Sequence, residues 1–388
     1  MRKLRATLGV VIVLGVAAAA ASVAVAKTTN TTATAASSLS CKSVVIGSMG
    51  PYTGPVASIG LDQLHWAQFF VQRWNAKHKM KVTLVPGDSQ LDPSKASIIG
   101  QQFASNGKMV ALIGPSGSQE VIAAGPILKK AGLVFVSSSA TRTDLTDGHL
   151  AGYFYRVVPK DSDQGSTIAT YLTAKLHVGS GDTVMDIDNQ NAYSTGLSDT
   201  VDKDLKAKGV DVDRESIAST ATDYSSLVAK IGSKTKAVVL TWQVAANAQL
   251  FSQQMRQQGK NAIIFGSDGV FDNSKFTFPG AYVSFFAPDV TTFPQAQSIV
   301  KLFKAVYGET GPFGAPTWVA AQVLVNAAAR ACADGKISRA EMRAQIKKTN
   351  LRQTILGTPI KFNKNGDISG AQFHVFHIVS GGKYVTVQ

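Results

Sequence analysis

The motifs of common enzyme and metal sites are missing from this 388-residue chain. It has two cysteines and no C-x-x-C or H-E-x-x-H pair, which are frequent metal-binding patterns. No G-x-x-x-x-G-K-[ST] phosphate loop occurs. The turn Gly114-Pro-Ser-Gly-Ser differs from the G-x-S-x-G nucleophile elbow because Ser118 replaces the final glycine. These absences argue against an enzyme, and we expect no cofactor.

Two residue pairs have side chains that can bind a metal. His374 and His377 are three positions apart in an expected strand and would therefore face opposite sides. Asp186 and Asp188 would share one face at a strand end and could hold an ion, but two carboxylates alone are a weak signal and loop capping explains them better. We therefore expect no metal site.

A basic stripe with interleaved aromatic residues, as in many nucleic-acid-binding proteins, is also missing. The formal charge is +14, three units of which come from cations in the first five residues, and the other basic residues are scattered along the chain. We expect a solvated basic surface that favours an anionic cell wall or membrane, and no nucleic-acid partner.

The one long apolar run lies at the N-terminus. Basic residues, an apolar segment over 8–16 and the small-residue site Ala24-Val25-Ala26 predict a signal peptide over 1–26 and export to the periplasm or cell surface. The alternative is a membrane anchor, because the apolar stretch approaches the roughly 20 residues that a span needs. Residues 27–41, rich in threonine, alanine and serine, are expected to form a flexible tether.

The two cysteines, Cys41 and Cys332, leave two interpretations open. In an exported chain they could form a disulfide joining the start of the first strand to a late helix. Alternatively, Cys41 could be the lipidated residue of a lipoprotein, although Ser38 stands where a leucine is usual, three positions before it. We favour the disulfide.

The most informative feature is a pair of apolar runs that each end in small hydroxyl residues. Residues 109–113 lead into Gly-Pro-Ser-Gly-Ser, and residues 133–136 lead into Ser-Ser-Ser-Ala-Thr. A strand that runs into such a helix start places hydroxyls and free backbone N–H groups at the carboxyl edge of a sheet. Open α/β sheets bind ligands there, and helix N-termini attract anions. The two turns predict a pocket for a small carboxylate.

Strand-like runs alternate with amphipathic segments over most of the chain, which predicts two α/β units with parallel sheets. We expect strands at 43–48, 82–85, 109–113, 133–136, 183–187, 237–240 and 263–266. We expect helices at 61–78, 93–106, 121–131, 162–176, 194–208, 245–258, 315–333 and 338–349. Asp161 is expected to cap the 162–176 helix with Gln164 completing a capping box. Residues 360–379 are expected to form a hairpin that turns at 365–367.

The ordered motifs resemble the leucine/isoleucine/valine-binding family of ABC-transporter substrate-binding proteins, from about Ser43 to the C-terminus. The matching stretches are 46–55, 88–93, 109–147, 156–165, Tyr193 after 188–190, 223–227, 265–269 and 362–366.

This resemblance implies a two-lobe periplasmic-binding-protein type I fold, with a helix-flanked parallel sheet in each lobe and three hinge crossovers. Lobe 1 would hold 42–158 and 286–357, and lobe 2 would hold 159–285 and 358–388. The implied function is capture of a small amino acid or related carboxylate by a monomer that delivers it to an ABC permease. The alternative is a surface sensor that hands its loaded state to a signalling protein.

The resemblance also implies roles for individual residues. Ser118 matches a hydroxyl that binds the ligand carboxylate, and Thr141 matches one that touches both carboxylate and amine. Ser139 matches a position whose backbone carbonyl accepts from the ammonium. Tyr193 matches an aromatic residue that closes from lobe 2, and Asp268 stands where amino-acid binders place a glutamate. The less favoured alternatives are ordinary helix capping for the serine and threonine and turn formation for the aspartate.

Three departures from the family pattern put the identity of the ligand's side chain in doubt. Trp242 stands where a tyrosine is frequent, Ile59 replaces a frequent aromatic near the rim of lobe 1, and serine follows Tyr193 in place of glycine. Trp242 is included among the expected ligand contacts. The ligand need not be leucine.

Overall fold

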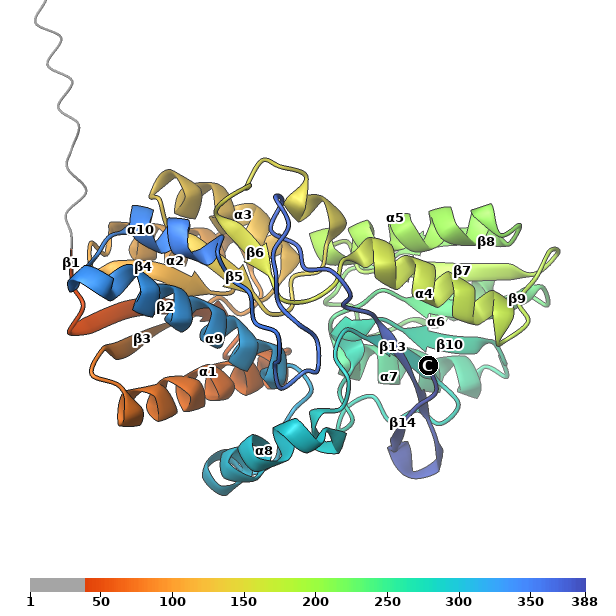
Figure 1. Cartoon of the computed structure of the whole chain (residues 1–388). Helices are drawn as coiled ribbons and strands as arrows, with labels where there is room; N and C mark the ends of the chain where they lie inside the picture. The colour runs from red at the N-terminus through yellow and green to blue at the C-terminus, as the bar shows by residue number, and fades with distance from the viewer. Residues whose placement is uncertain (1–38) are drawn as a thin grey trace, which may run out of the picture. The chain divides into compact units, whose positions relative to one another are not determined.

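The computed structural model describes residues 39–388, which contain two β-sheets flanked by helices and a short two-stranded pair (Figure 1). The predicted signal peptide and nearly all of the predicted tether lie outside the described residues. None of the helices in the described part of the chain has the length and apolar character needed to cross a membrane.

The first sheet is parallel throughout, with the order β3-β2-β4-β5-β6. Its strands are β2 (Ser43–Gly50), β3 (Lys81–Asp88), β4 (Met109–Ile113), β5 (Val134–Ser137) and β6 (Phe154–Arg156). Side chains alternate across it. Phe135 of β5 packs into a core with α2 (Pro93–Ser105) and α3 (Ser118–Lys130). Its neighbours Val134 and Val136 face α1 (Ala57–Lys77), α9 (Gly314–Ala331) and α10 (Arg339–Ile346) on the other side (Figure 1).

The second sheet has the order β14-β13-β11-β10-β9-β7-β8, parallel from β8 to β11 and antiparallel at β13 and β14. Its strands are β7 (Thr183–Asp188), β8 (Asp211–Ser216), β9 (Thr235–Leu240), β10 (Ile263–Gly266), β11 (Tyr282–Phe285), β13 (His374–Ile378) and β14 (Tyr384–Thr386). Val239 packs with α4 (Asp161–Ala174) and α5 (Ala192–Ala207). Val238 and Leu240 face α6 (Ser225–Lys230) and α7 (Ala245–Gln257).

The chain passes between the two sheets three times, as a type I periplasmic-binding-protein fold requires. It crosses after β6, after β11 and again between α10 and β13. The second passage is followed by η3 (Val290–Thr292) and α8 (Pro294–Tyr307). The residues at which each lobe begins and ends stay a prediction.

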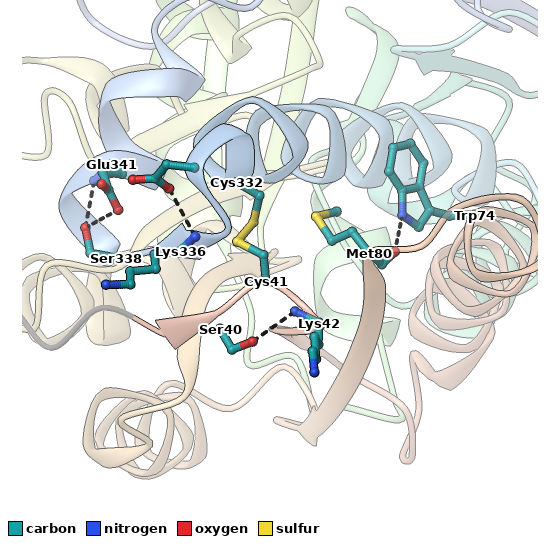
Figure 2. The surroundings of a disulfide bond; sticks show 10 residues. Ser40, Cys41, Lys42, Trp74, Met80, Cys332, Lys336, Ser338 and Glu341 are labelled. Atoms are coloured by element: carbon teal, nitrogen blue, oxygen red, sulfur yellow. Dashed lines mark hydrogen bonds between the residues drawn. A yellow bond between two sulfur atoms is a disulfide. The ribbon is translucent and has the colours of Figure 1, made fainter.

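A disulfide joins Cys41 to Cys332, with an S–S distance of 2.03 Å (Figure 2). It lies beside the short ladder of β1 (Leu39–Ser40) with β12 (Lys336–Ile337), and the Cys41 N–H donates to the carbonyl of Gly335 at 3.1 Å. Cys332 begins η4 (Cys332–Asp334) directly after α9. Because the Cys41 sulfur is bonded to Cys332, this structure offers no thiol at position 41 for a lipid.

The expected capping box at Asp161 is wrong. Helix α4 begins at Asp161 itself, and the residue before it, Lys160, is the N-cap. The Lys160 N–H donates to the carboxylate of Asp163 at 3.4 Å, and the Gln164 side-chain amide instead donates to Ser284 Oγ at 2.9 Å. Asp161 and Gln164 both turn into the protein interior, where both are fully buried.

The expected hairpin over 360–379 is also wrong, although its turn exists. The Asn363 N–H donates to the Asp367 carbonyl at 2.8 Å, and a single bridge joins Phe362 to Ile368. The following strand β13 pairs with β11 on one side and β14 on the other, turning at η5 (Ser380–Gly382). The exposed edge of β11 supplies a ladder that local sequence does not reveal. Strands β8 and β11 and helices α6 and α8 were not expected either.

Candidate ligand-binding site

Two hydroxyl-rich turns meet at the carboxyl edge of the first sheet. Parallel pairing of Ile113 with Val136 brings the ends of β4 and β5 side by side. The Ser137 hydroxyl donates to the Pro115 carbonyl at 2.6 Å, and the Ser139 hydroxyl donates to the Ser116 carbonyl at 2.7 Å. The neighbouring turns predicted from the sequence therefore contact each other directly.

Ser118 is the first residue of α3 and is buried. Its hydroxyl accepts from the backbone N–H of Arg142 at 3.2 Å, which ties the start of α3 to the segment after β5. Thr141 immediately precedes that N–H, and its own buried hydroxyl acts on the Asp161 carboxylate as a hydrogen-bond donor. Both hydroxyls therefore lie where the start of α3 meets the segment after β5.

The second sheet contributes a tyrosine and an aspartate that are bonded to each other. Tyr193, in the first turn of α5, donates its hydroxyl to Asp268 Oδ1 at 2.5 Å. Asp268 opens the short helix η2 (Asp268–Val270) directly after β10. Burial raises the pKa of Asp268 to about 6, a shift that the Tyr193 hydrogen bond opposes. Burial and the nearby Asp268 charge hold the pKa of Tyr193 well above its usual value, so its hydroxyl stays protonated as a donor.

Asp161 connects the two halves of the site and was missed as a site residue by the sequence reasoning. Its backbone N–H donates to the Thr141 carbonyl at 2.8 Å, and its buried carboxylate feels the charge of Asp268. The Thr141 hydroxyl acts on this carboxylate as a hydrogen-bond donor, which opposes the rise in its pKa. Burial, followed by the Asp268 charge, raises the pKa of Asp161 to about 8. Residues 156–165 are among the stretches that resemble the family, but the resemblance assigned no ligand contact to Asp161.

The two arginines near the site, Arg156 and Arg142, form their hydrogen bonds with groups other than Asp161 and Asp268. Arg156 is fully buried and donates to Asp367 Oδ1 at 2.6 Å and to the Arg142 carbonyl at 2.7 Å. The Arg142 guanidinium binds Asp144 through two contacts, at 2.7 and 2.9 Å, and also donates to the Ala192 carbonyl. Neither donates a hydrogen bond to Asp161 or Asp268. The site therefore carries buried acidic groups that no protein cation contacts directly, an arrangement suited to a cationic ligand group.

A cleft of about 860 Å³ opens beside these residues and is lined by both lobes. Its walls include Val56, Leu91 and Ile122 from the first lobe and Ala192 and Val244 from the second. The chain also contacts itself across the lobes here: Gln119 Nε2 donates to Gln243 Oε1 at 2.9 Å. Gln119 follows Ser118, and Gln243 follows Trp242. None of the six predicted ligand-binding residues lines this cleft.

Trp242 lies within an aromatic cluster of the second lobe. Its ring centroid is 5.2 Å from that of Tyr224 and 5.7 Å from that of Phe251, and the residue is 1% exposed. Its neighbour Gln243 lines the cleft instead. Ligand contact by the Trp242 ring stays a prediction, with its ring faces engaged in core packing. Ile59 is half-buried against the first-lobe core.

The aspartates and histidines that could have bound a metal have other contacts in the structure. Asp188 accepts from Arg214 Nε at 2.9 Å and from the Gln190 N–H at 2.8 Å, so it both pairs with a cation and caps a loop. Burial and the neighbouring Asp202 raise the pKa of Asp186. His377 stacks on Tyr282 at 4.6 Å. Between residues 39 and 388, no group of three or more histidine, cysteine, aspartate or glutamate side chains is placed to hold a metal.

Residues 43–383 match the family model of the periplasmic binding proteins. The chain belongs to the periplasmic binding protein family. An amino acid binding protein of Pseudomonas aeruginosa is 27% identical over 358 residues, covering 90% of this chain and 93% of that protein. The Leu/Ile/Val-binding protein homolog 2 of Brucella abortus is 27% identical, covering 89% of this chain and 93% of that protein.

Solved structures of other binding proteins have the same fold. A leucine-binding protein from Thermotoga maritima superposes with a TM-score of 0.80 at 23% identity, covering 89% of this chain and 98% of that one. A branched-chain amino acid binding protein from Streptococcus pneumoniae, in complex with isoleucine, gives 0.77 at 23% identity, covering 89% and 100%. A solute-binding protein from R. palustris, in complex with benzoate, gives 0.76 at 19% identity, covering 89% and 95%.

These similarities confirm the predicted two-lobe α/β fold and the resemblance to the leucine/isoleucine/valine-binding proteins. This periplasmic binding protein belongs to a family whose members bind substrates and are not enzymes. The structural neighbours take ligands of different chemistry, an amino acid in one case and an aromatic carboxylate in another. The fold alone therefore leaves the ligand open.

Proposed function

We propose that this periplasmic binding protein captures a small amino acid or related carboxylate between its lobes by hinge closure and delivers it to an ABC permease. The observation that carries the proposal is the approach of the Ser118 and Thr141 turns to the Tyr193–Asp268 pair through Asp161. Hydroxyls and a helix N-terminus suit the carboxylate of a zwitterion, and buried acids suit its ammonium group.

The hydroxyl-rich side is assigned to the ligand carboxylate. Ser118 begins α3, so free backbone N–H groups of the first turn and the positive end of the helix dipole lie beside its hydroxyl. Thr141 has a buried hydroxyl next to the same turn. The Ser139 carbonyl is assigned as an acceptor for the ammonium, on the strength of the family resemblance.

The second lobe is assigned to closing the site. Tyr193 and Asp268 belong to elements that follow β7 and β10, and the β9 strand between them holds their ends together. Hinge movement of the lobes would bring this pair onto a ligand already seated on the first-lobe turns. Isoleucine in the Streptococcus pneumoniae protein supports an amino acid as the ligand, while benzoate in the R. palustris protein supports keeping other carboxylates in the test.

Membership of the periplasmic binding protein family implies a place of action outside the cytoplasm. We place the protein in the periplasm or on the cell surface, acting as a monomer with a membrane permease as its partner. The related proteins that bind amino acids support this role.

Isothermal titration calorimetry against the twenty amino acids, their amides and a set of aliphatic and aromatic carboxylates tests the proposal. We expect one ligand class to bind at a single site per chain. Mass spectrometry of small molecules released from the purified protein gives an independent identification. If no amino acid and no other small carboxylate binds, the proposed function is wrong.

A further inference from the structure

The basic residues, which are scattered along the sequence, are distributed unevenly between the two lobes. The ranges predicted as lobe 1 contain 20 lysines and arginines and 10 aspartates and glutamates, whereas the ranges predicted as lobe 2 contain 15 of each kind. The net charge is therefore +10 on the first lobe and zero on the second. A difference of this size can orient the molecule beside an anionic surface.

Much of the excess charge lies at the amino edge of the first sheet, where its strands begin and the connecting helices end. Lys42 directly precedes β2, Lys81 begins β3 and Lys108 directly precedes β4. Lys129 and Lys130 end α3, just before β5. We call this face the basic edge, and its exposed lysines are Lys42, Lys77, Lys79, Lys81, Lys108, Lys129, Lys130, Lys336, Lys347 and Lys348.

Helix α10 crosses the same edge and brings the last three of these lysines to it. The Arg339 guanidinium donates to the carbonyls of Asn106 and Ala131, at 2.8 Å each, just before β4 and β5. The Arg343 guanidinium lies 4.6 Å from the ring centre of Tyr153, directly before β6. The lysines that precede and follow this helix therefore extend the basic edge along the starts of β4, β5 and β6.

Stabilisation of helix ends does not explain the charge of the basic edge. A lysine at the C-terminal end of a helix interacts favourably with the helix dipole, and the second lobe also has such lysines, at the ends of α4 and α5. In the second lobe, however, acids stand at the corresponding edge: Asp182 directly precedes β7 and Asp211 begins β8. The ten lysines of the basic edge are accompanied only by Asp147, Asp334 and Glu341 among the described residues.

The charges of the basic edge are also not neutralised by ion pairs. In the described part of the chain, the lysines that pair with an acid are Lys230, Lys275 and Lys304, and none of them belongs to this edge. The amines of Lys81 and Lys129 donate to backbone carbonyls, which leaves their charge uncompensated. A surface of this kind is suited to the phosphate groups of an anionic partner.

The path of the chain indicates which anionic partner covers this edge. The described residues begin at Leu39 in β1, which pairs with β12 at Lys336, and the Cys41–Cys332 disulfide lies between Lys42 and Lys336 (Figure 2). The sequence before this point predicts a signal peptide, which directs the chain through a membrane. The basic edge is therefore the part of the folded lobe that directly follows the membrane-directed segment of the chain.

We propose that the basic edge docks the protein on the surface of a membrane that contains anionic phospholipids. Each lysine close to such a surface strengthens binding about fivefold. The Ser118 and Thr141 turns follow the carboxyl ends of the strands, at the opposite edge of the same sheet, so docking leaves the candidate ligand site open. This inference adds a membrane contact to the proposed ligand capture and does not depend on it.

Sedimentation with lipid vesicles tests the docking, using protein purified after export so that its N-terminus is the natural one. Vesicles of equal parts phosphatidylglycerol and phosphatidylcholine are compared with vesicles of phosphatidylcholine alone, at low and at physiological salt. The variant combines Lys42→Gln, Lys79→Gln and Lys108→Gln, whose side-chain amines have no hydrogen bond or ion pair among the described residues. The control removes three exposed lysines from the amino edge of the second sheet: Lys175→Gln, Lys208→Gln and Lys234→Gln.

We expect the wild-type protein to bind the anionic vesicles in preference to phosphatidylcholine, and more weakly as added salt screens the charges. The basic-edge variant should bind the anionic vesicles about 100-fold more weakly, since three lysines contribute about fivefold each. The control variant loses the same net charge and should bind within about twofold of the wild type, because its lysines lie beyond the screening length from the docked surface. Thermal unfolding checks that both variants are folded.

Four results would overturn the docking and leave the proposed ligand capture untouched. Absence of binding to anionic vesicles at physiological salt would mean that the basic edge is only solvated. Equal binding to both kinds of vesicle would assign the contact to an apolar segment. Equal losses in the two variants would show that total charge, and not this edge, is responsible. Binding to soluble polyphosphate without binding to vesicles would identify an anionic polymer as the partner in place of a membrane.

Discussion

The buried side chains of the candidate site differ in the hydrogen-bond partners that the protein supplies to them. Ser118 and Ser139 are engaged by backbone and side-chain groups of the first lobe, and Tyr193 and Asp268 are engaged by each other. Asp161 is acted on by the Thr141 hydroxyl and by two arginines that form their hydrogen bonds with other acids. Its buried carboxylate is therefore less fully paired than the other polar groups of the site.

Truncating the head-group contacts should weaken ligand binding without unfolding the protein. We expect Ser118→Ala and Asp268→Ala each to cost about 1–3 kcal/mol of ligand affinity, because each leaves a buried polar ligand group unpaired. Calorimetry with the ligand found in the panel measures this cost. Ser105→Ala, at an exposed position near the end of α2, is the control and should bind as the wild type does. Unchanged affinity in both site variants would mean that the pocket has been misplaced.

The buried ion pair of Arg156 with Asp367 joins the end of β6 to the returning C-terminal segment, with 2.6 Å between Nε and Oδ1. Asp367→Ala should lower the free energy of unfolding by about 3–5 kcal/mol, because it leaves a buried guanidinium without its counter-charge. Urea denaturation provides the measurement. For comparison, Glu309→Ala removes an exposed pair with Lys304 and should cost less than about 1 kcal/mol. If both variants lowered the free energy of unfolding by the same amount, the buried pair would not be more important for stability than the exposed one.

At the scale of elements, helices α1 and α9 pack closely because α9 starts with a glycine. A Cβ atom at Gly314 would lie 1.7 Å from Trp66 Cδ1 and 2.7 Å from Asp62 Oδ1. Asp62, on α1, also accepts from the Gly311 N–H at 3.1 Å, just before α9 begins. The start of α9 is therefore held against α1 by both close packing and a buried carboxylate.

Adding a methyl group at this contact should force the two helices apart. We expect Gly314→Ala to lower the free energy of unfolding by about 1–3 kcal/mol or more, as overpacking of a core does. Gly232→Ala is the matched control, because its Cβ would meet nothing within 4 Å. Thermal and urea unfolding of the two variants measure the difference. A Gly314→Ala protein as stable as the control would show that the helices tolerate separation.

The pattern of elements was largely predictable, because strands and helices follow hydrophobic periodicity within short stretches. Strand β4 at Met109–Ile113 and strand β10 at Ile263–Gly266 have the predicted bounds. Strand β8 was missed because its residues Asp-Val-Asp-Arg-Glu-Ser are largely polar on an edge strand. Strand β13 lies within a segment that was expected to fold on itself, and its partner β11 is about ninety positions earlier in the chain.

Across the whole molecule, several buried acids have raised pKa values for the same physical reason. Burial raises the pKa of Asp62 and Glu120 to about 7, and that of Asp161 to about 8. These groups hold protons in the folded state that the unfolded chain has already lost at neutral pH. Their contribution therefore makes the folded protein less stable as the pH rises.

We expect the free energy of unfolding of the ligand-free protein to fall between pH 6.5 and pH 8.5. Each acid still protonated in the folded state contributes up to about 1.4 kcal/mol per pH unit. The range begins at 6.5 because burial lowers the pKa of His65 and His374, which makes stability rise with pH below that value. Urea denaturation across this range measures the slope, and Asp62→Asn should reduce it. A stability that increases over these two pH units would contradict the assignment.

Local sequence was sufficient for the two α/β units and the hydroxyl-rich turns, because periodicity and strand-to-helix turns depend on neighbours along the chain. The candidate zwitterion contacts were implied by the family resemblance and stay a prediction. Of the two interpretations of Cys41, the structure contains the bond to Cys332, which depends on a residue 291 positions away. Tertiary structure also decided that Asp161, expected as a helix cap, is a buried acid whose pKa the Asp268 charge raises, and that Trp242 packs against Tyr224 and Phe251. The contacts and the protonation state of a buried side chain depend on elements that are distant in the sequence and that folding brings together. A local sequence pattern therefore does not predict them.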